Sequence, residues 1–223
     1  MHLEWGGAGL REGGRLADVV VVVDVLSFST AVAEGVAAGA EVYPLRAGDR
    51  YATKVAERLG ARLVSAGDRV RTPERVVLVS PHGGALALDA AATGATVVAG
   101  CLRNASAVGA WMAERAGQGR MVVVAAGDEW RDGSPRWAVE DLLAAGAIFS
   151  ALPGHALSAE AQVAAAAFAG ARDRLGEILR TCTSGRLVDT RWAAELDASP
   201  VVPVLVEGRF QAAPDGREPA GGG

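Results

Sequence analysis

The hydrophobic residues of this chain come in short β-branched runs that alternate with alanine-rich stretches. The clearest run is Val19 to Val23, five valines without a polar residue among them. An uninterrupted apolar run is typical of a parallel strand that is covered on both faces. The next segment, Ser27 to Ala38, has the composition of a helix, with Ser27 or Ser29 as its N-cap and Gly39 as its end. The pattern therefore predicts a buried strand followed directly by a helix.

The same unit recurs along the first part of the chain. Further strands are predicted at Glu41 to Leu45, Arg62 to Val64, Val76 to Val79, Ala95 to Ala99 and Met121 to Ala126. Further helices are predicted at Arg50 to Leu59, at Ala85 to Ala92 and from about Asn104 to Arg115. Alternating strands and helices indicate a three-layer α/β/α domain with a largely parallel sheet.

The last third of the chain is predicted to be mostly helical. Its helices are expected at Trp137 to Leu152, Ser158 to Phe168, Ala171 to Arg180 and Leu187 to Leu196. Val201 to Val206 is predicted to be a late strand at the sheet edge, where Pro203 would be tolerated. We find no internal repeat or linker and expect residues 1–210 to form a single α/β domain. Residues 211–223 are rich in Gly, Pro and Ala and are expected to be a disordered tail.

Composition and charge exclude several classes of protein. Half of the 223 residues are hydrophobic, and the formal net charge is −4 without a long basic run. Nucleic-acid binding is therefore not expected, because it depends on Lys and Arg that neutralise phosphates. The sequence contains neither an apolar stretch long enough for a bilayer nor a signal-peptide pattern, and it has only two widely separated cysteines. These features predict a cytoplasmic protein that does not contact a membrane, and they leave a homo-oligomer open.

Polar or glycine-rich segments follow four of the predicted strands, at residues 24–30, 80–84, 100–104 and 127–132. Ligands of parallel sheets bind outside the carboxyl ends of the strands, so we expect these segments to form one shared rim. The sequence has no Walker A loop, G-x-S-x-G motif or H-E-x-x-H motif. The glycines among the first fourteen residues precede the first predicted strand and so form no Rossmann fingerprint.

Asp24 opens the first of these segments. A carboxylate at a strand end suits a hard cation such as Mg²⁺, while the hydroxyls of Ser27, Ser29 and Thr30 at the helix start suit an anion. A helix cap at Asp24 or Ser27 explains the same residues, and the two roles are compatible.

The second segment contains Ser80, His82 and Gly83. Its glycines permit close approach of a ligand to the backbone, and His82 could act as a general acid or contact a phosphate. An ordinary strand-to-helix turn with an exposed histidine is the competing interpretation.

In the third segment, Arg103 offers planar donors for a phosphate or carboxylate, and Asn104 can cap the helix that follows. Cys101 is interpreted as structural, because small buried cysteines are commoner than reactive ones.

Farther along the chain, Glu140 and Asp141 lie early in a predicted helix, where the helix dipole favours acids. Two adjacent acids exceed what capping requires, so we interpret this pair as functional, although acids on the protein surface are also common.

In this order, these segments resemble the 2-phosphosulpholactate phosphatase family. The matching stretches are Val21–Thr30, Val97–Asn104, Val122–Gly127, Glu140–Ala147, Cys182–Arg186 and Asp197–Leu205. The resemblance implies Mg²⁺-dependent hydrolysis of a phosphate monoester on a small acidic metabolite. It implies that Asp24 with Glu140 or Asp141 holds the metal, and that Arg103, Arg186 and Gly83 hold the phosphate with help from Ser184. Together with the chemistry of the strand-end segments, it leads us to expect that Asp24, His82 and Glu140 are catalytic. From the same chemistry we expect Ser27, Ser29, Thr30, Ser80 and Asn104 to contact the substrate as well.

The chain departs from the family pattern at two of these residues. Ser27 stands where the family commonly has arginine, and His82 stands where it commonly has asparagine. A noncatalytic binder of a phosphorylated metabolite is therefore the alternative hypothesis. A nucleotide-binding enzyme is a third hypothesis, for which the sequence offers no phosphate-binding fingerprint.

Overall fold

The valine run forms β2 (Val19–Val23), and all five side chains are buried. Val19, Val21 and Val23 pack into the hydrophobic core on one face of the sheet, and Val20 and Val22 pack into the core on the other face. The absence of polar positions in this run is thus explained by burial on both faces, as the sequence predicts.

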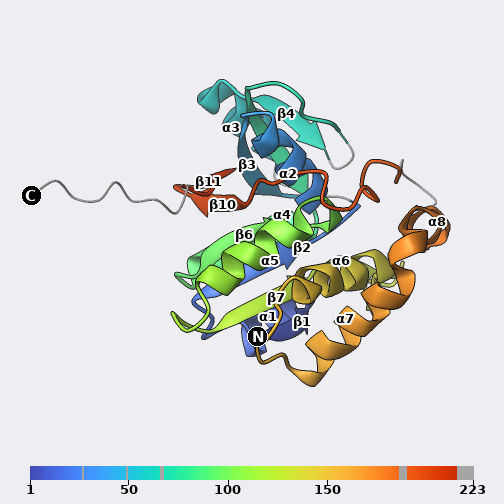
Figure 1. Cartoon of the computed structure of the whole chain (residues 1–223). Helices are drawn as coiled ribbons and strands as arrows, with labels where there is room; N and C mark the ends of the chain where they lie inside the picture. Colours follow the sequence, from blue (N-terminus) through green and yellow to red (C-terminus); the bar gives the residue numbers. More distant parts are fainter. Residues whose placement is uncertain (27, 49, 66–67, 186–189, 215–223) are drawn as a thin grey trace, which may run out of the picture.

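The computed structural model describes residues 1–26, 28–48, 50–65, 68–185 and 190–214. In this part of the chain, nine strands form one sheet in the order β1-β7-β2-β6-β10-β11-β3-β5-β4 (Figure 1). Two groups of strands within it are parallel. The first group contains β1 (His2–Trp5), β7 (Met121–Ala125), β2 and β6 (Thr96–Gly100). The second contains β3 (Glu41–Arg46), β5 (Arg75–Ser80) and β4 (Arg62–Ser65).

Helices cover both faces of this sheet and complete the predicted three layers (Figure 1). One face packs against α1 (Gly6–Glu12), α2 (Ser29–Ala37) and α4 (Gly83–Ala92). The other packs against α5 (Ala105–Glu114), α6 (Val139–Ser150), α7 (Ala159–Ala171) and α8 (Leu175–Thr181). The remaining α-helix, α3 (Ala52–Leu59), contacts β4 and β5. Among the described residues, no helix has the length and apolar character needed to cross a membrane.

The late strand lies inside the sheet, so its predicted position at the edge is wrong. Its residues form β10 (Pro203–Val206), which makes a hairpin with β11 (Arg209–Ala212). The hairpin joins the two parallel groups, because β10 pairs with β6 and β11 pairs with β3. Phe210 of β11 is fully buried and meets the ring of Phe28 edge-on at 5.7 Å. Burial of this apolar surface explains why the hairpin occupies the interior.

The chain also departs from the predicted elements at four other places. Residues 2–12 form β1 and α1 where no element is expected, so the first glycines follow a strand. The segment after β7 folds into a small hairpin of β8 (Asp128–Glu129) and β9 (Pro135–Arg136). The described part of the helix predicted at 187–196, residues 190–196, forms turns and no helix. β11 extends to Ala212, beyond the expected end of the ordered domain at residue 210.

Candidate active site

Asp24 directly follows β2 and is buried. Its Oδ2 accepts a hydrogen bond of 2.8 Å from the backbone N–H of Gly83 and lies 3.5 Å from the hydroxyl of Ser80. Gly83 is the first residue of α4, and Ser80 is the last residue of β5. The structure therefore brings together three of the predicted site residues from two separate strand ends.

Ser29 and Thr30 hold the turn after β2 together. The Ser29 hydroxyl accepts from the backbone N–H of Asp24 and donates to the carbonyl of Val22, both at 2.9 Å. The Thr30 hydroxyl donates to the carbonyl of Val25 at 2.6 Å. Both side chains are buried and engaged with backbone groups. Ser29 is the first residue of α2 and not its N-cap, because its hydroxyl bonds back to β2; the Ser29 capping prediction is wrong. Ser27 lies outside the described residues.

Asp141 links the segment after β2 to the segment after β7. Its Oδ1 accepts from the N–H of Val25 at 2.8 Å, and its Oδ2 accepts from the N–H of Gly127 at 2.9 Å. Glu140 is next to it in the first turn of α6 and is also buried. The Glu140 Oε2 has no hydrogen-bond partner among the described residues. Asp141 thus uses both of its oxygens to hold these two segments together.

The three carboxylates influence one another electrostatically. Burial raises the pKa of Asp24 to about 6, with Glu140 adding to the rise, while the Gly83 N–H and His82 partly oppose it. Burial also raises the pKa of Asp141 well above its usual range, and the charges of Asp24 and Glu140 raise it further. Burial and mutual repulsion therefore disfavour the charged forms of Asp24 and Asp141, and a bound cation would offset both effects.

The donor atoms at this point fit a hard cation in chemical type. Mg²⁺ prefers one or two carboxylates and keeps several waters, so Asp24 and Glu140 are the residues that would hold it. The orphaned Oε2 of Glu140 supports this assignment, whereas both Asp141 oxygens accept backbone hydrogen bonds. Within the described ranges, no group of three or more His, Cys, Asp or Glu side chains is arranged to hold a metal.

A pocket of about 400 Å³ borders the segments that donate hydrogen bonds to Asp24 and Asp141, although neither carboxylate lines it. His82 and Gly127 line the pocket. His82 directly precedes Gly83, whose N–H bonds to Asp24, and the N–H of Gly127 bonds to Asp141. His82 lies just before α4, and its charge helps to lower the pKa of both Asp24 and Asp128. The histidine thus lines the pocket and is close enough to Asp24 to act on it electrostatically.

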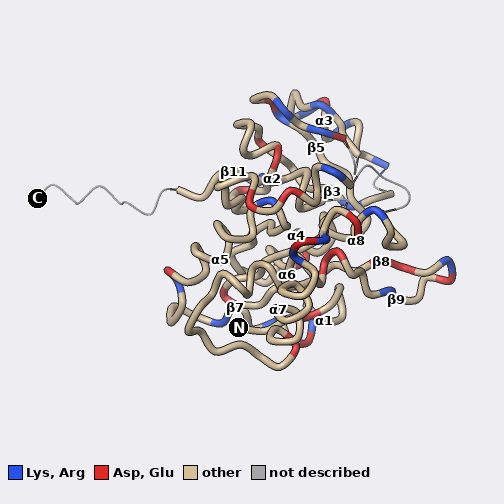
Figure 2. Tube along the Cα trace, turned by 45° about the vertical axis from the view of Figure 1, so that its right-hand side comes forward, with Lys and Arg blue, Asp and Glu red and all other residues tan. Residues whose placement is uncertain are grey.

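Arg136 and Asp128 form a polar wall of the pocket; Asp128 belongs to the predicted segment 127–132, whereas Arg136 was not predicted from the sequence. They pair with each other, and Arg136 also donates to the Ser184 hydroxyl at 2.6 Å. Burial alone would raise the pKa of Asp128, but the Glu129 N–H and Arg136 outweigh it, and the pKa is lowered. Arg136 and Asp128 lie in the β8–β9 hairpin, which extends from the body of the domain (Figure 2). In the sequence, these two residues are marked only by their position between the end of a predicted strand and the start of a predicted helix.

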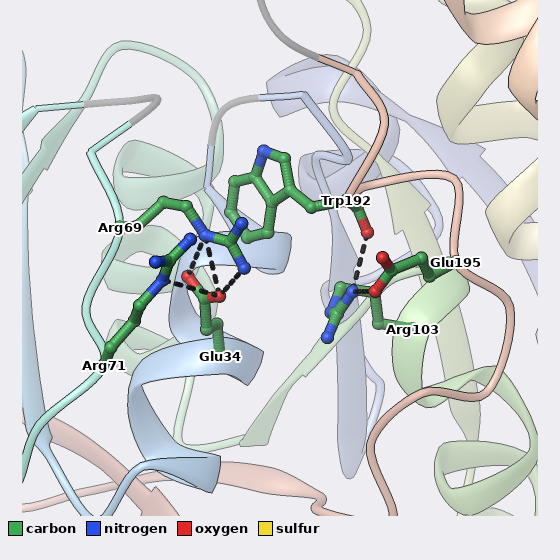
Figure 3. A network of polar contacts seen from close by, with 6 residues as sticks. All are labelled: Glu34, Arg69, Arg71, Arg103, Trp192 and Glu195. Atoms are coloured by element: carbon green, nitrogen blue, oxygen red, sulfur yellow. Dashed lines mark hydrogen bonds and ion pairs between the residues drawn. The ribbon is translucent and has the colours of Figure 1, made fainter.

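Arg103 is engaged by the segment that precedes β10 (Figure 3). Its guanidinium donates to the carbonyl of Trp192 at 2.7 Å and forms an ion pair with Glu195. The Trp192 ring in turn lies 4.6 Å from the guanidinium of Arg69, which pairs with Glu34. Among the described residues, Arg103 thus has no hydrogen bond or ion pair with Asp24, Glu140 or Asp141. Its buried Nε has no partner in the same part of the chain. Arg186 lies outside the described residues.

Asn104 and Cys101 hold the end of β6 in place. The Asn104 side chain accepts from the N–H of Cys101 at 2.9 Å and donates to the carbonyls of Ala99 and Val201. Its side chain caps no N–H of α5. Burial raises the pKa of the Cys101 thiol to about 11, so the nucleophilic thiolate is scarce at neutral pH. These contacts support the structural interpretation of Cys101.

The layered sheet and its rim of buried carboxylates define an α/β protein with a site at its strand ends. Residues 44–208, more than half of the chain, match the 2-phosphosulpholactate phosphatase family, and the chain belongs to this family of phosphatases. The resemblance inferred from the sequence is confirmed. The matched range begins after Asp24, and the hydrogen bond from Gly83 connects Asp24 to it. No curated protein matches the chain.

Proposed function

We propose that the protein is a Mg²⁺-dependent phosphatase that hydrolyses a phosphate monoester of a small acidic metabolite. The observation that supports this proposal is the convergence of Asp24, Glu140 and Asp141 beside a pocket lined by His82. Membership of a phosphatase family supports the reaction class. Phosphoryl transfer depends on positioning and charge stabilisation, which such a rim can supply.

In this proposal, each group has a distinct task. Asp24 and Glu140 hold Mg²⁺, which when bound supplies positive charge that stabilises the oxygens of the transferred phosphoryl group. Asp141 accepts hydrogen bonds from the N–H groups of Val25 and Gly127 and so holds the segments after β2 and β7 in place. A water molecule attacks the phosphorus and passes its proton to solvent, while the bond from phosphorus to the leaving oxygen breaks. His82, which lines the pocket, donates a proton to that leaving oxygen.

The test is phosphate release from a panel of phosphate monoesters, with Mg²⁺ and with EDTA. We expect release only with Mg²⁺ and a loss of at least about 100-fold in Glu140→Gln, a range typical of lost charge stabilisation. Glu160→Gln is the matched control, because Glu160 lies in the first turn of α7 and is exposed. Metal-independent release, or full activity in Glu140→Gln, would contradict the proposal.

The alternative is a noncatalytic binder of a phosphorylated metabolite. It is motivated by the departures from the family pattern at Ser27 and His82, where the family commonly has arginine and asparagine. Thermal stabilisation by a phosphate monoester without any turnover would support this alternative. We also infer a cytoplasmic location, which is supported by the free thiols of Cys101 and Cys182.

A further inference from the structure

One guanidinium lines the pocket and is held there by three different side chains. Arg136 lies directly opposite Asp128 in the β8–β9 hairpin, and the two side chains form an ion pair. The Arg136 Nη2 also donates to the hydroxyl of Ser184, in the segment after α8, at 2.6 Å. The centroid of the Trp130 ring lies 5.5 Å from the guanidinium carbon. These contacts orient the guanidinium before any ligand binds.

The guanidinium keeps hydrogen-bond donors for a ligand. Its Nη2 makes the contacts with both Asp128 and Ser184, whereas Nε and Nη1 have no hydrogen bond with any described residue. An arginine side chain has five N–H donors, so several of them remain. The Asp128 carboxylate, for its part, also accepts from the N–H of Glu129 and from the Ser184 hydroxyl. Because the Asp128 charge is shared among several donors, the guanidinium can still attract a second acid group.

The other charges around the pocket allow an acidic ligand to approach Arg136. Among the described residues that line the pocket, Arg136 is the only lysine or arginine, and Asp89, Asp128 and Glu129 are the acids. Asp89 is paired with Arg46. Asp128 is paired with Arg136 itself. Glu129 is exposed, so solvent and salt screen its charge. The acids are therefore paired or screened, and Arg136 is the partner that the pocket offers to an acid group.

His82 connects this guanidinium to the carboxylates at the strand ends. It lines the same pocket and directly precedes Gly83, whose N–H bonds to Asp24. Burial acts to raise the pKa of both Asp24 and Asp128, and the charge of His82 opposes it at both, so His82 is close to each of them. A short molecule with its phosphate at Asp24 thus reaches Arg136 past His82. The volume of about 400 Å³ is ample for such a molecule.

We propose that Arg136 binds a carboxylate that the substrate carries in addition to its phosphate. The inference rests on the proposed function and deepens it, because it names the residue that selects an acidic metabolite among phosphate monoesters. Arg136 is then a specificity-determining residue that contacts the substrate away from the phosphate. Asp128 and Ser184 are positioning residues, since they act through the guanidinium. A phosphate monoester without a carboxylate loses this contact and binds more weakly.

The test compares two pairs of esters, in the presence of Mg²⁺, in which a carboxylate replaces a hydroxymethyl group. One pair is 3-phosphoglycerate and glycerol 1-phosphate, and the other is 2-phosphoglycerate and glycerol 2-phosphate. In at least one pair, the wild-type protein should prefer the acid by about tenfold or more in kcat/KM, as expected for a hydrogen bond between charged groups. Arg136→Gln should lower kcat/KM for that acid at least about tenfold more than for its uncharged counterpart, mainly through KM. Arg136→Lys keeps the positive charge and should retain part of the preference.

Arg174→Gln is the matched control. Arg174 directly precedes α8, is exposed, pairs with Glu177 and does not line the pocket. Its substitution should leave the preference for the acid unchanged. An equal loss for the acid and the uncharged ester in Arg136→Gln is the result that a purely structural role gives, and it would overturn the inference. Absence of a preference for the acid in both pairs with the wild-type protein would overturn it too.

A binding measurement separates failure of the inference from failure of the proposed function. If no ester is hydrolysed, the two pairs are titrated with Mg²⁺ present and followed by thermal shift in the wild-type protein and in Arg136→Gln. Stronger stabilisation by an acid than by its uncharged counterpart, lost in Arg136→Gln, would support the carboxylate contact even though the phosphatase proposal had failed. Equal stabilisation of both proteins, or none, would overturn the carboxylate contact as well.

Discussion

The Oδ2 of Asp24 accepts a hydrogen bond from the backbone N–H of Gly83 at 2.8 Å. This contact joins the end of β2 to the start of α4 and orients the carboxylate at the rim. Gly83 leaves the space that the contact needs. A Cβ there would lie 2.7 Å from the same Asp24 oxygen and 2.6 Å from the Phe28 side chain.

Gly83→Ala is therefore expected to displace the Asp24 carboxylate. Overpacking of this kind costs roughly 1–3 kcal/mol of unfolding free energy, and we expect metal-dependent phosphate release to fall at the same time. Gly176→Ala is the control, because a Cβ at this helical glycine meets nothing within 4 Å. Urea unfolding and activity assays check both variants. A Gly83→Ala protein with wild-type activity would show that the Asp24 contact is dispensable.

Asp24→Asn should abolish metal-dependent activity and leave the fold intact. The amide keeps an oxygen that can accept from Gly83, but it removes the charge that would bind Mg²⁺. We expect a loss of at least about 100-fold in phosphate release, with a circular dichroism spectrum like that of the wild-type protein. Asp173→Asn, at an exposed carboxylate, is the control. If Asp24→Asn keeps full turnover, Asp24 does not hold the metal.

The buried carboxyl of Asp24 should make the unfolding free energy depend on pH. Its pKa in the folded protein, about 6, exceeds its ordinary value of 3.8 because the carboxyl is buried. The folded state therefore binds more protons between about pH 4 and 6, and the unfolding free energy of the metal-free protein falls as pH rises through this window. The Asp24 contribution is on the order of 3 kcal/mol.

Urea unfolding at pH 4 and pH 7 in EDTA measures this effect. Asp24→Asn should reduce the loss of unfolding free energy between these pH values, while Asp141 continues to contribute in the same direction. The same dependence in the variant and the wild-type protein would exclude Asp24 as its source.

Phe210→Ala tests whether the C-terminal hairpin is part of the core. The ring is fully buried against Phe28, so we expect a loss of about 3–5 kcal/mol in unfolding free energy. Because Phe28 lies in the turn after Asp24, activity at moderate temperature should also fall. Val163→Ala, at an exposed side chain, should change stability by less than about 0.5 kcal/mol. A similarly small effect of Phe210→Ala would contradict the central position of the hairpin.

Local pattern alone predicted much of this architecture. The apolar run at Val19–Val23 required burial on both faces, and the glycine after α3, Gly60, ends that helix in a left-handed conformation. These features depend on neighbours in sequence, which is why periodicity and turn residues revealed them. The rule that ligands bind at strand ends led to Asp24 and Gly83, and the two adjacent acids early in a predicted helix led to Asp141. The structure brings these three residues into one hydrogen-bonded rim.

Tertiary structure decided the rest. The sequence could not show that β10 and β11 lie between β6 and β3, because strand order depends on long-range pairing and on where Phe210 can be buried. Nor could it show that Arg103 is engaged by Glu195 or that Arg136 lines the pocket, since these contacts join distant segments. The sequence by itself determined which residues end the strands. Packing of the sheet and its hairpin determined which of those residues meet.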